Sequence, residues 1–284
     1  MSRADDLSRI EHALKLAAGV LENFTPGAVA AKTKTGDDPV TAADLALNEV
    51  LHQALPQPGE GWLSEETADD TSRLGRGRVW VVDPLDGTRE FVKGIPEWCV
   101  SVAVVEDGMA VAGGILSPGP GHLILGAAGE GVTLNGVPAA CTTTSSLSGA
   151  LVLASRSEVK RGEWDRFFGT DISVRNMGSV AYKLGLVGAG LADATWTLVP
   201  KHEWDVAAGA AIVLAGGGTL LTLDGEEPVF NQENPKLTGF IATAPGLAAP
   251  VREFLGLALP PTATPSARSS PSPGEAETEV HPTT

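Results

Sequence analysis

The chain has 284 residues, of which 43% are hydrophobic, and it carries a formal net charge of −15 at pH 7. This acidity argues against a nucleic-acid polymer as partner, because such a partner requires a basic surface for its phosphates. The sequence shows neither an apolar run long enough to span a bilayer nor the apolar core of a secretory signal, so we expect a cytoplasmic protein without a membrane partner.

The first part of the chain reads as two helices followed by strands. Apolar residues at three-to-four spacing predict a helix over residues 7–24, and a second helix is expected to begin near Thr41. The apolar residues of the second helix are Leu45, Val50, Leu51 and Leu55. Strands are predicted next at residues 79–82, 100–105, 109–116 and 123–127, with hairpin turns at 106–108 and 134–137.

After residue 139 the pattern changes to alternating strands and helices. Strands are predicted at 150–155 and 194–198, and helices at 180–190 and from Trp204 to the glycines at 216–218. The predicted segments are an N-terminal α+β half with the metal-binding motifs (1–138), a C-terminal α/β half that closes a cleft (139–259) and a disordered tail (260–284). We expect disorder in the tail because its Pro, Ser, Thr and Glu residues bury too little apolar surface.

Two aspartates follow the apolar run VWVV. Asp83 ends that predicted strand, and Pro84 and Gly87 form a tight turn that would aim Asp86 back at the same point. Hard oxygen ligands gathered on a turn suit Mg²⁺, which completes its shell with water and phosphate oxygens. An ordinary turn is the alternative interpretation, since Asp-Pro and Asp-Gly pairs are common in turns.

Three further acidic motifs each have a purely structural interpretation. Glu65 and Glu66 in WLSEET would be a solvated surface pair. Asp44 would close a capping box with Thr41, and Asp205 would be an N-cap acid of the helix that follows. These carboxylates are also compatible with a cleft site, in which Asp205 holds a metal and its helix N-terminus faces a phosphate.

Taken together, the four acidic motifs resemble those of the inositol monophosphatase superfamily, whose members are Mg²⁺-dependent phosphatases. DPLDGTREF is similar to the family's D-P-[IL]-D-G-T signature and LSEET to its [GS]-E-E segment, while PVTAAD and WDVAAG are similar to V-T-x-x-D and W-D-x-A-[AG]-G. The motifs occur in the family's order, and the resemblance covers about residues 8–245. It implies a layered α/β/α/β/α sandwich of mixed α+β and α/β class, with the active site between the two halves.

The resemblance also implies a role for each motif residue. Thr88 would pair with Asp44 to orient and deprotonate a metal-bound water, and the backbone amides of Gly87 and Thr88 would hold the phosphate. Two or three Mg²⁺ ions would bind the phosphoryl oxygens, activate the water and stabilise the leaving alkoxide, giving direct in-line hydrolysis of a phosphomonoester. The implied metal ligands are Glu66, Asp83, the carbonyl of Leu85, Asp86 and Asp205, of which Asp205 also borders the substrate.

The residues after the signature indicate the substrate. Residues 88–91, TREF, are similar to the T-[KR]-E-F of the bisphosphate nucleotidases, which remove the 3′-phosphate of adenosine 3′,5′-bisphosphate. Arg156 and Lys183 would then bind the second phosphate, although Lys183 is also interpretable as a solvated helix lysine. FVKGIPEW instead resembles the inositol branch, so an inositol-1-monophosphatase or a broad sugar phosphate phosphatase stays open as an alternative.

Two rival classes share some of these features. A haloacid-dehalogenase-like phosphatase also carries an aspartate loop after a strand, but its aspartates are two positions apart, whereas Asp83 and Asp86 are three apart. A non-catalytic binding protein on the same fold is less favoured, because every motif residue is present. The expected partner is a small phosphorylated metabolite. Members of the family are commonly homodimers, although no residue of this sequence identifies a dimer surface.

Overall fold

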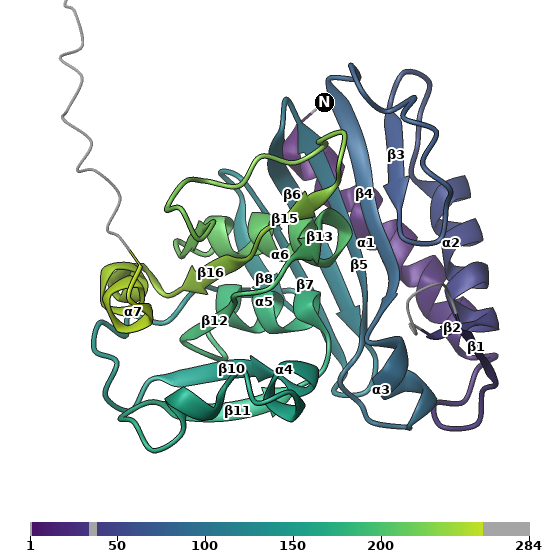
Figure 1. The fold of residues 1–284 in the computed structure, drawn as a ribbon. Coiled ribbons are helices and arrows are strands. Elements are labelled where there is room, and N and C mark those ends of the chain that lie inside the picture. The colour runs from purple at the N-terminus through teal and green to yellow at the C-terminus, as the bar shows by residue number, and fades with distance from the viewer. Residues whose placement is uncertain (1, 34–38, 258–284) are drawn as a thin grey trace, which may run out of the picture.

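The computed structural model describes residues 2–33 and 39–257, so the tail predicted over 260–284 lies outside the described residues. Two β-sheets, one of seven strands and one of five, dominate the fold. Two helices lie between the sheets, and further helices cover the outer face of each sheet (Figure 1). The predicted α/β/α/β/α sandwich is confirmed.

The strands of the seven-stranded sheet lie side by side in the order in which they occur in the sequence. Its strands are β3 Gly61–Ser64, β4 Arg78–Asp86, β5 Cys99–Glu106, β6 Met109–Ser117, β7 His122–Ala127, β8 Gly131–Leu134 and β9 Val137–Ala139. Neighbours in this order are paired, β3 with β4 in parallel and the later pairs antiparallel. The predicted hairpin turns are confirmed, since residues 107–108 and 135–136 have the positive φ angles that tight turns between antiparallel strands require.

Helices α1 (Arg3–Leu21) and α2 (Ala42–Ala54) cover the outer face of this sheet (Figure 1). Helix α2 begins at the predicted capping box, in which the backbone N–H of Thr41 donates to Asp44 at 2.8 Å. Leu45 was expected on the apolar face of α2 but is 55% exposed, because the buried stripe runs through residues 43, 47, 51 and 55, with Leu51 and Leu55 buried as expected. The buried apolar residues of α2 are Ala43, Leu47 and Leu51.

Helices α5 (Val180–Gly188) and α6 (Glu203–Ala215) form the layer between the sheets (Figure 1). They approach each other closely, because a Cβ on Gly209 would lie only 2.2 Å from the Cβ of Leu184. Helix α6 also contacts the large sheet, where a Cβ on Gly113 would lie 2.4 Å from a backbone oxygen of α6. Apolar burial on several sides explains why this helix is apolar around most of its circumference.

The five-stranded sheet comes from the second half of the chain. Its strands are β10 Leu151–Ser155, β11 Ser173–Met177, β12 Ala194–Thr197, β14 Thr219–Leu221 and β16 Phe240–Thr243. They lie in the order β11-β10-β12-β16-β14, with β10 parallel to both of its neighbours. The core on the outer face of this sheet contains the stacked rings of Trp164 and Trp196, 5.0 Å apart, and residues of α7 (Ala248–Leu255).

The remaining elements are short. They are β1 Ala31–Thr33, β2 Pro39–Thr41, α3 Thr88–Val92, α4 Arg156–Lys160, η1 Asp165–Phe167, β13 Lys201–His202, β15 Lys236–Leu237 and η2 Pro245–Leu247. The large sheet ends at Ala139 and the small sheet begins at Leu151, whereas the core around α5 and α6 contains residues of both halves. We propose that the chain is organised as two halves that meet at residue 138.

A cluster of ion pairs joins α1 to the segment before β3 and to the start of β4. Its central carboxylate belongs to Glu60, which accepts from Arg9 Nη2 and from Arg78 Nε, each at 2.7 Å. Trp80 Nε1 donates to the same carboxylate at 2.8 Å. Burial alone would raise the pKa of Glu60, but these hydrogen bonds and one from the backbone of Gln57 lower it to about 2.

Glu60 should therefore stabilise the fold only while it is ionised. Because its folded-state pKa lies below the ordinary value of 4.5, this stabilisation is present above about pH 4.5 and is lost as the pH falls towards 2. We expect Glu60→Gln to lower the free energy of unfolding by about 2 kcal/mol at pH 7, and by less at pH 3. Urea titrations at both pH values measure the difference.

The matched control is Glu11→Gln, which removes an exposed pair between Glu11 and Lys15. That substitution should change the free energy of unfolding by less than about 0.5 kcal/mol at either pH. An equal loss for Glu60→Gln at pH 7 and pH 3 would contradict the assignment of an ionised, stabilising Glu60.

Candidate active site

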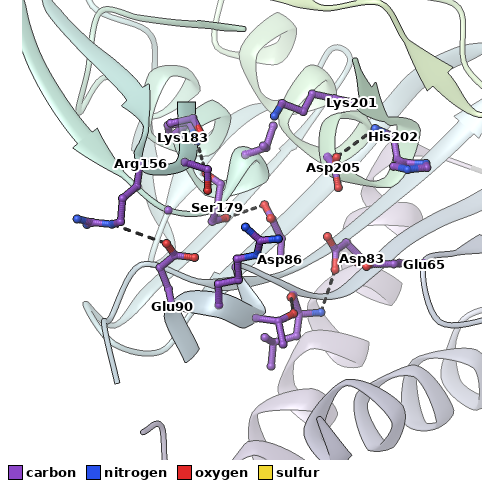
Figure 2. A pocket seen from close by; sticks show the side chains of 18 of the residues that line it. Glu65, Asp83, Asp86, Glu90, Arg156, Ser179, Lys183, Lys201, His202 and Asp205 are labelled. Carbon is purple, nitrogen blue, oxygen red and sulfur yellow. Dashed lines mark hydrogen bonds and ion pairs between the residues drawn. The ribbon is translucent and has the colours of Figure 1, made fainter. Parts of the chain in front are cut away.

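A pocket of about 420 Å³ lies between the end of β4 and the starts of α5 and α6 (Figure 2). One part of its wall comes from the first half of the chain, through β4, the turn after it and α3. The rest comes from the second half, through the turn between β10 and α4, the start of α5 and the segment at β13 and α6. Side chains from distant parts of the sequence therefore meet in one concave site.

Strand β4 delivers two aspartates to this pocket. The register between β4 and β5 shifts between Asp83 and Asp86, an irregularity that lets side chains three positions apart face the same space. Gly87 follows with φ of 97°, and a Cβ there would lie 2.9 Å from the carbonyl oxygen of Glu97. Glycine is thus required at this turn, both for its backbone angle and for the close approach.

Carboxylate oxygens of Asp83, Asp86 and Asp205 all lie within 4.8 Å of one another. Burial, followed by the negative charge of Glu65, raises the pKa of Asp83 well above its usual range. Burial likewise raises the pKa of Asp86, and burial together with the charge of Asp86 raises that of Asp205. Such a group of buried like charges is unfavourable unless a cation lies among them.

Among the described residues, Glu65 lines the pocket and Glu66 does not. Figure 2 shows Glu65 beside Asp83. The backbone N–H of Glu65 still bonds to the carbonyl of Val82 on β4, at 3.3 Å, which places this residue level with the aspartates. Residues 65 and 66 lie in the turn that follows β3, and the first of these two glutamates is the one that lines the pocket. We therefore propose Glu65 as the metal ligand in place of the predicted Glu66.

Asp205 is the third residue of α6 and not its N-cap residue, so the N-cap prediction is wrong. The N-cap residue is His202, whose backbone N–H donates to Asp205 Oδ2 at 3.1 Å. This bond fixes the carboxylate at the helix start, beside Asp83 and Asp86.

Thr88 and Asp44 are in contact, as the family resemblance implied. Thr88 Oγ1 lies 3.0 Å from Asp44 Oδ1 and 3.0 Å from the carbonyl oxygen of Leu85. The other carboxylate oxygen of Asp44 accepts from the backbone N–H and the hydroxyl of Thr41, at 2.8 and 2.6 Å. Asp44 is 1% exposed, so this buried carboxylate is held rigidly while one oxygen faces Thr88.

The two predicted phosphate-binding cations both line the pocket, but each is already engaged. Arg156 donates from Nη2 to Glu97, and its Nε lies 3.7 Å from Glu90. Lys183 is 3% exposed and donates to the carbonyl of Ser179 at 2.9 Å, so its interpretation as a solvated helix lysine is wrong. Burial lowers the pKa of Lys183 to about 8.

A third cation, Lys201, was missed by the sequence prediction. It lines the pocket next to Lys183, and its Nζ lies 3.0 Å from Glu158 Oε1 (Figure 2). Glu158 is 1% exposed and also accepts from Thr197 Oγ1 at 2.6 Å. Lys201 is therefore anchored by a buried, well-bonded carboxylate. The available signal was its place four positions before Asp205.

Ser179 was also missed. It lines the pocket as the N-cap residue of α5, and its hydroxyl donates to Asp86 at 2.7 Å. A serine before a helix predicts a cap, but no sequence pattern indicates that the hydroxyl reaches a carboxylate on another strand.

The donor set fits a hard divalent cation. The three clustered carboxylates offer oxygen ligands within 4.8 Å of one another, and burial raises the pKa of each of them. Oxygen-only ligation with few carboxylates is typical of Mg²⁺, while thiol and imidazole ligands typical of zinc are lacking among the described residues of this cluster. Fold and site together define a metal-dependent phosphatase.

The chain belongs to the inositol monophosphatase family, whose model matches residues 5–254. It is 36% identical to the inositol-1-monophosphatase of Mycobacterium leprae over 82% of this chain and 84% of that protein. It is 33% identical to the histidinol-phosphatase of Mycobacterium tuberculosis, covering 78% and 84% of the two chains. The 3′-phosphoadenosine 5′-phosphate phosphatase of Mycobacterium leprae is 33% identical, with coverage of 75% and 82%.

Among solved structures, a Thermotoga maritima IMPase superimposes with a TM-score of 0.78 and 25% identity, over 90% of this chain and 97% of that one. Membership of this family confirms the predicted enzyme class, a metal-dependent phosphoric monoester hydrolase. It also confirms that the substrate is a small phosphorylated molecule. In the described part of the chain, no helix has both the length and the apolar character needed to cross a membrane.

Proposed function

We propose that this enzyme removes the 3′-phosphate of adenosine 3′,5′-bisphosphate, using Mg²⁺ as the metal. The observation that supports this substrate class is the distribution of charge in the pocket. Carboxylates gather at the end of β4 and the start of α6, while the second half of the chain contributes Arg156, Lys183 and Lys201 to the same space. A substrate with one phosphate at a metal and a second anionic group nearby is complementary to both regions.

The proposed metal ligands are Glu65, Asp83, the carbonyl of Leu85, Asp86 and Asp205. Bound there, Mg²⁺ would neutralise the phosphoryl oxygens and lower the pKa of the attacking water. The chain itself prepares this site by holding its carboxylates in fixed places. Leu85 N–H donates to Asp83 at 3.0 Å, and Ser179 and Ala181 donate to Asp86.

Thr88 and Asp44 are the proposed proton acceptors. Thr88 Oγ1 would take a proton from the attacking water and pass its own proton to Asp44 Oδ1, 3.0 Å away. The second oxygen of Asp44 is occupied by Thr41, which keeps the accepting oxygen directed at Thr88. We further propose that the backbone amides of Gly87 and Thr88 bind the phosphate as it is transferred.

Lys201 and Lys183 are the proposed ligands of the second phosphate. Lys201 reaches the pocket from β13 and is anchored by Glu158, so little conformational entropy is lost when it binds an anion. Arg156 contributes less directly, because two carboxylates, Glu97 and Glu90, face its guanidinium, whereas one carboxylate, Glu158, faces Lys201. This revises the predicted pair Arg156 and Lys183 to Lys183 and Lys201, with Arg156 supporting the wall.

Inositol 1-phosphate is the second candidate substrate, favoured by the 36% identity to an inositol-1-monophosphatase. Histidinol phosphate, suggested by the name of another relative, carries an ammonium group that the lysines of this pocket would repel. Measuring Mg²⁺-dependent phosphate release from adenosine 3′,5′-bisphosphate, inositol 1-phosphate, fructose 1,6-bisphosphate and histidinol phosphate tests the proposal. Activity confined to inositol 1-phosphate would overturn the bisphosphate assignment and leave the phosphatase intact.

Replacing Lys201 by alanine should change substrate preference more than overall activity. For adenosine 3′,5′-bisphosphate we expect kcat/KM to fall by about 10-fold to 100-fold, since a hydrogen bond to a charged group contributes about 1.5–3 kcal/mol. For adenosine 3′-monophosphate, which lacks the second phosphate, the value should change little. Lys160→Ala, at an exposed lysine of α4, is the matched control. Equal losses on both nucleotides would mean that Lys201 does not bind the second phosphate.

A further inference from the structure

Ser179 has a backbone conformation that its role as a helix cap does not require. Its φ and ψ angles are 58° and 119°, a combination that residues other than glycine rarely adopt. The other hydroxyl caps of long helices have extended backbones, with φ of −79° at Ser2 and −118° at Thr41. Because capping is achieved at those sites without strain, a different interaction must hold Ser179 in its place.

Contacts from both halves of the chain fix this backbone. The N–H of Gly178 donates to Glu97 Oε2 at 3.0 Å, and the carbonyl of Ser179 accepts from Lys183 Nζ at 2.9 Å. The preceding residue must be glycine, since a Cβ on Gly178 would lie 2.8 Å from the backbone oxygen of Glu97. Strain of about 1–3 kcal/mol persists where the surroundings determine the conformation in this way, and it is often found at active sites.

This conformation brings Ser179 to Asp86. The hydroxyl donates to Asp86 Oδ2 at 2.7 Å, and the N–H of Ala181 donates to the same oxygen at 2.6 Å. Two donors on one oxygen fix the orientation of the carboxylate, which lies among Asp83 and Asp205. Asp86 comes from β4 whereas Ser179 begins α5, so the contact joins the two walls of the pocket.

We propose that Ser179 is a positioning residue that holds Asp86 in the orientation needed to bind the divalent cation. The inference rests on the proposed function, in which Asp86 is a metal ligand. Partners that orient a ligating side chain typically contribute 10-fold to 100-fold to metal affinity. Strain in the protein backbone would thus be maintained for metal binding and not for helix formation.

Three substitutions separate the hydroxyl from the backbone strain. Ser179→Gly and Ser179→Ala both remove the hydroxyl, but glycine tolerates positive φ whereas alanine does not. Ser179→Thr retains the hydroxyl, while its branched Cβ adds to the strain. We expect the glycine and alanine variants to bind Mg²⁺ about 10-fold to 100-fold more weakly, and alike, although the glycine variant is the more stable of the two. The threonine variant should bind Mg²⁺ much as wild type does.

Calorimetric titration of EDTA-treated protein with Mg²⁺ gives the affinities, and urea unfolding of the metal-free protein gives the stabilities. Ser2→Ala is the control for loss of a helix cap, because Ser2 caps α1 far from the pocket, and it should leave Mg²⁺ affinity unchanged. Wild-type affinity in the glycine and alanine variants, or Mg²⁺ binding that follows stability across the series, would overturn the inference alone. Wild-type protein that binds no Mg²⁺ would overturn the proposed function and this inference together.

Discussion

Replacing Asp83 by asparagine should abolish phosphate release and, at the same time, make the metal-free protein harder to unfold. Both effects have one cause. Burial, and after it the negative charges of Glu65, Asp86 and Asp205, raises the pKa of Asp83 well above the usual range. A side chain that is proposed to bind a cation is therefore a source of repulsion when no cation is bound.

The expected loss of kcat is about 10³-fold or more, since charge stabilisation by a metal contributes several kcal/mol to the transition state. The free energy of unfolding of the metal-free variant should rise by an amount on the order of 1 kcal/mol at pH 7. This gain depends on pH. Because the folded-state pKa of Asp83 exceeds its ordinary value of 3.8, wild-type protein loses stability as the pH rises above that value, and the variant should lose less.

Asp193→Asn is the matched control, because Asp193 lies outside the pocket and is stabilised by its surroundings. It accepts from Thr142 Oγ1 at 2.6 Å and from the backbone N–H of Leu151 at 2.7 Å. Burial opposes these bonds, but the pKa of Asp193 is lowered overall. This variant should be less stable at pH 7 and keep its activity. An Asp83→Asn protein that is less stable than wild type, or that keeps a tenth of its activity, would contradict the site assignment.

Local chemistry explains why much of the fold was predictable from sequence. The turn at residues 106–108 was predicted because Asp-Gly between apolar runs supplies the positive φ of a tight hairpin. The start of α2 was predicted because Thr41 and Asp44 satisfy each other's backbone groups, and Gly216 ended α6 as expected. Each of these signals acts within a few residues of the position that it determines.

The errors concern side-chain direction and distant contacts. Glu65 and Glu66 have the same chemistry, and only the pairing of residue 65 with β4 decides which of them faces the pocket. Ser179 meets Asp86 across a sequence separation of 93 residues, and Lys201 is anchored by Glu158 of another element. No local pattern records such contacts, because they depend on how the two sheets pack around α5 and α6.

Replacing Thr88 by alanine should lower kcat by about 10²-fold to 10⁴-fold, the usual contribution of a positioned proton acceptor. Thr88→Ser retains the hydroxyl and should recover most of the activity. Mg²⁺ affinity, measured by calorimetry, should fall far less than kcat in Thr88→Ala, because the Thr88 side chain is not a proposed ligand and contacts only the carbonyl of Leu85 among the proposed ligands. Thr88 differs in this respect from Asp83, whose loss should remove metal binding and activity together.

Asp44→Asn completes the test, because in the proposed relay Thr88 passes its own hydroxyl proton to Asp44 Oδ1, 3.0 Å away, as it takes one from the water. If the two residues act as one unit, the double variant Thr88→Ala and Asp44→Asn should be no slower than the slower single variant. Asp44 also accepts from Thr41 at the start of α2, so Asp44→Asn should lower stability where Thr88→Ala does not. Rate losses that multiply in the double variant would show instead that the two side chains act independently, and the relay would have to be abandoned.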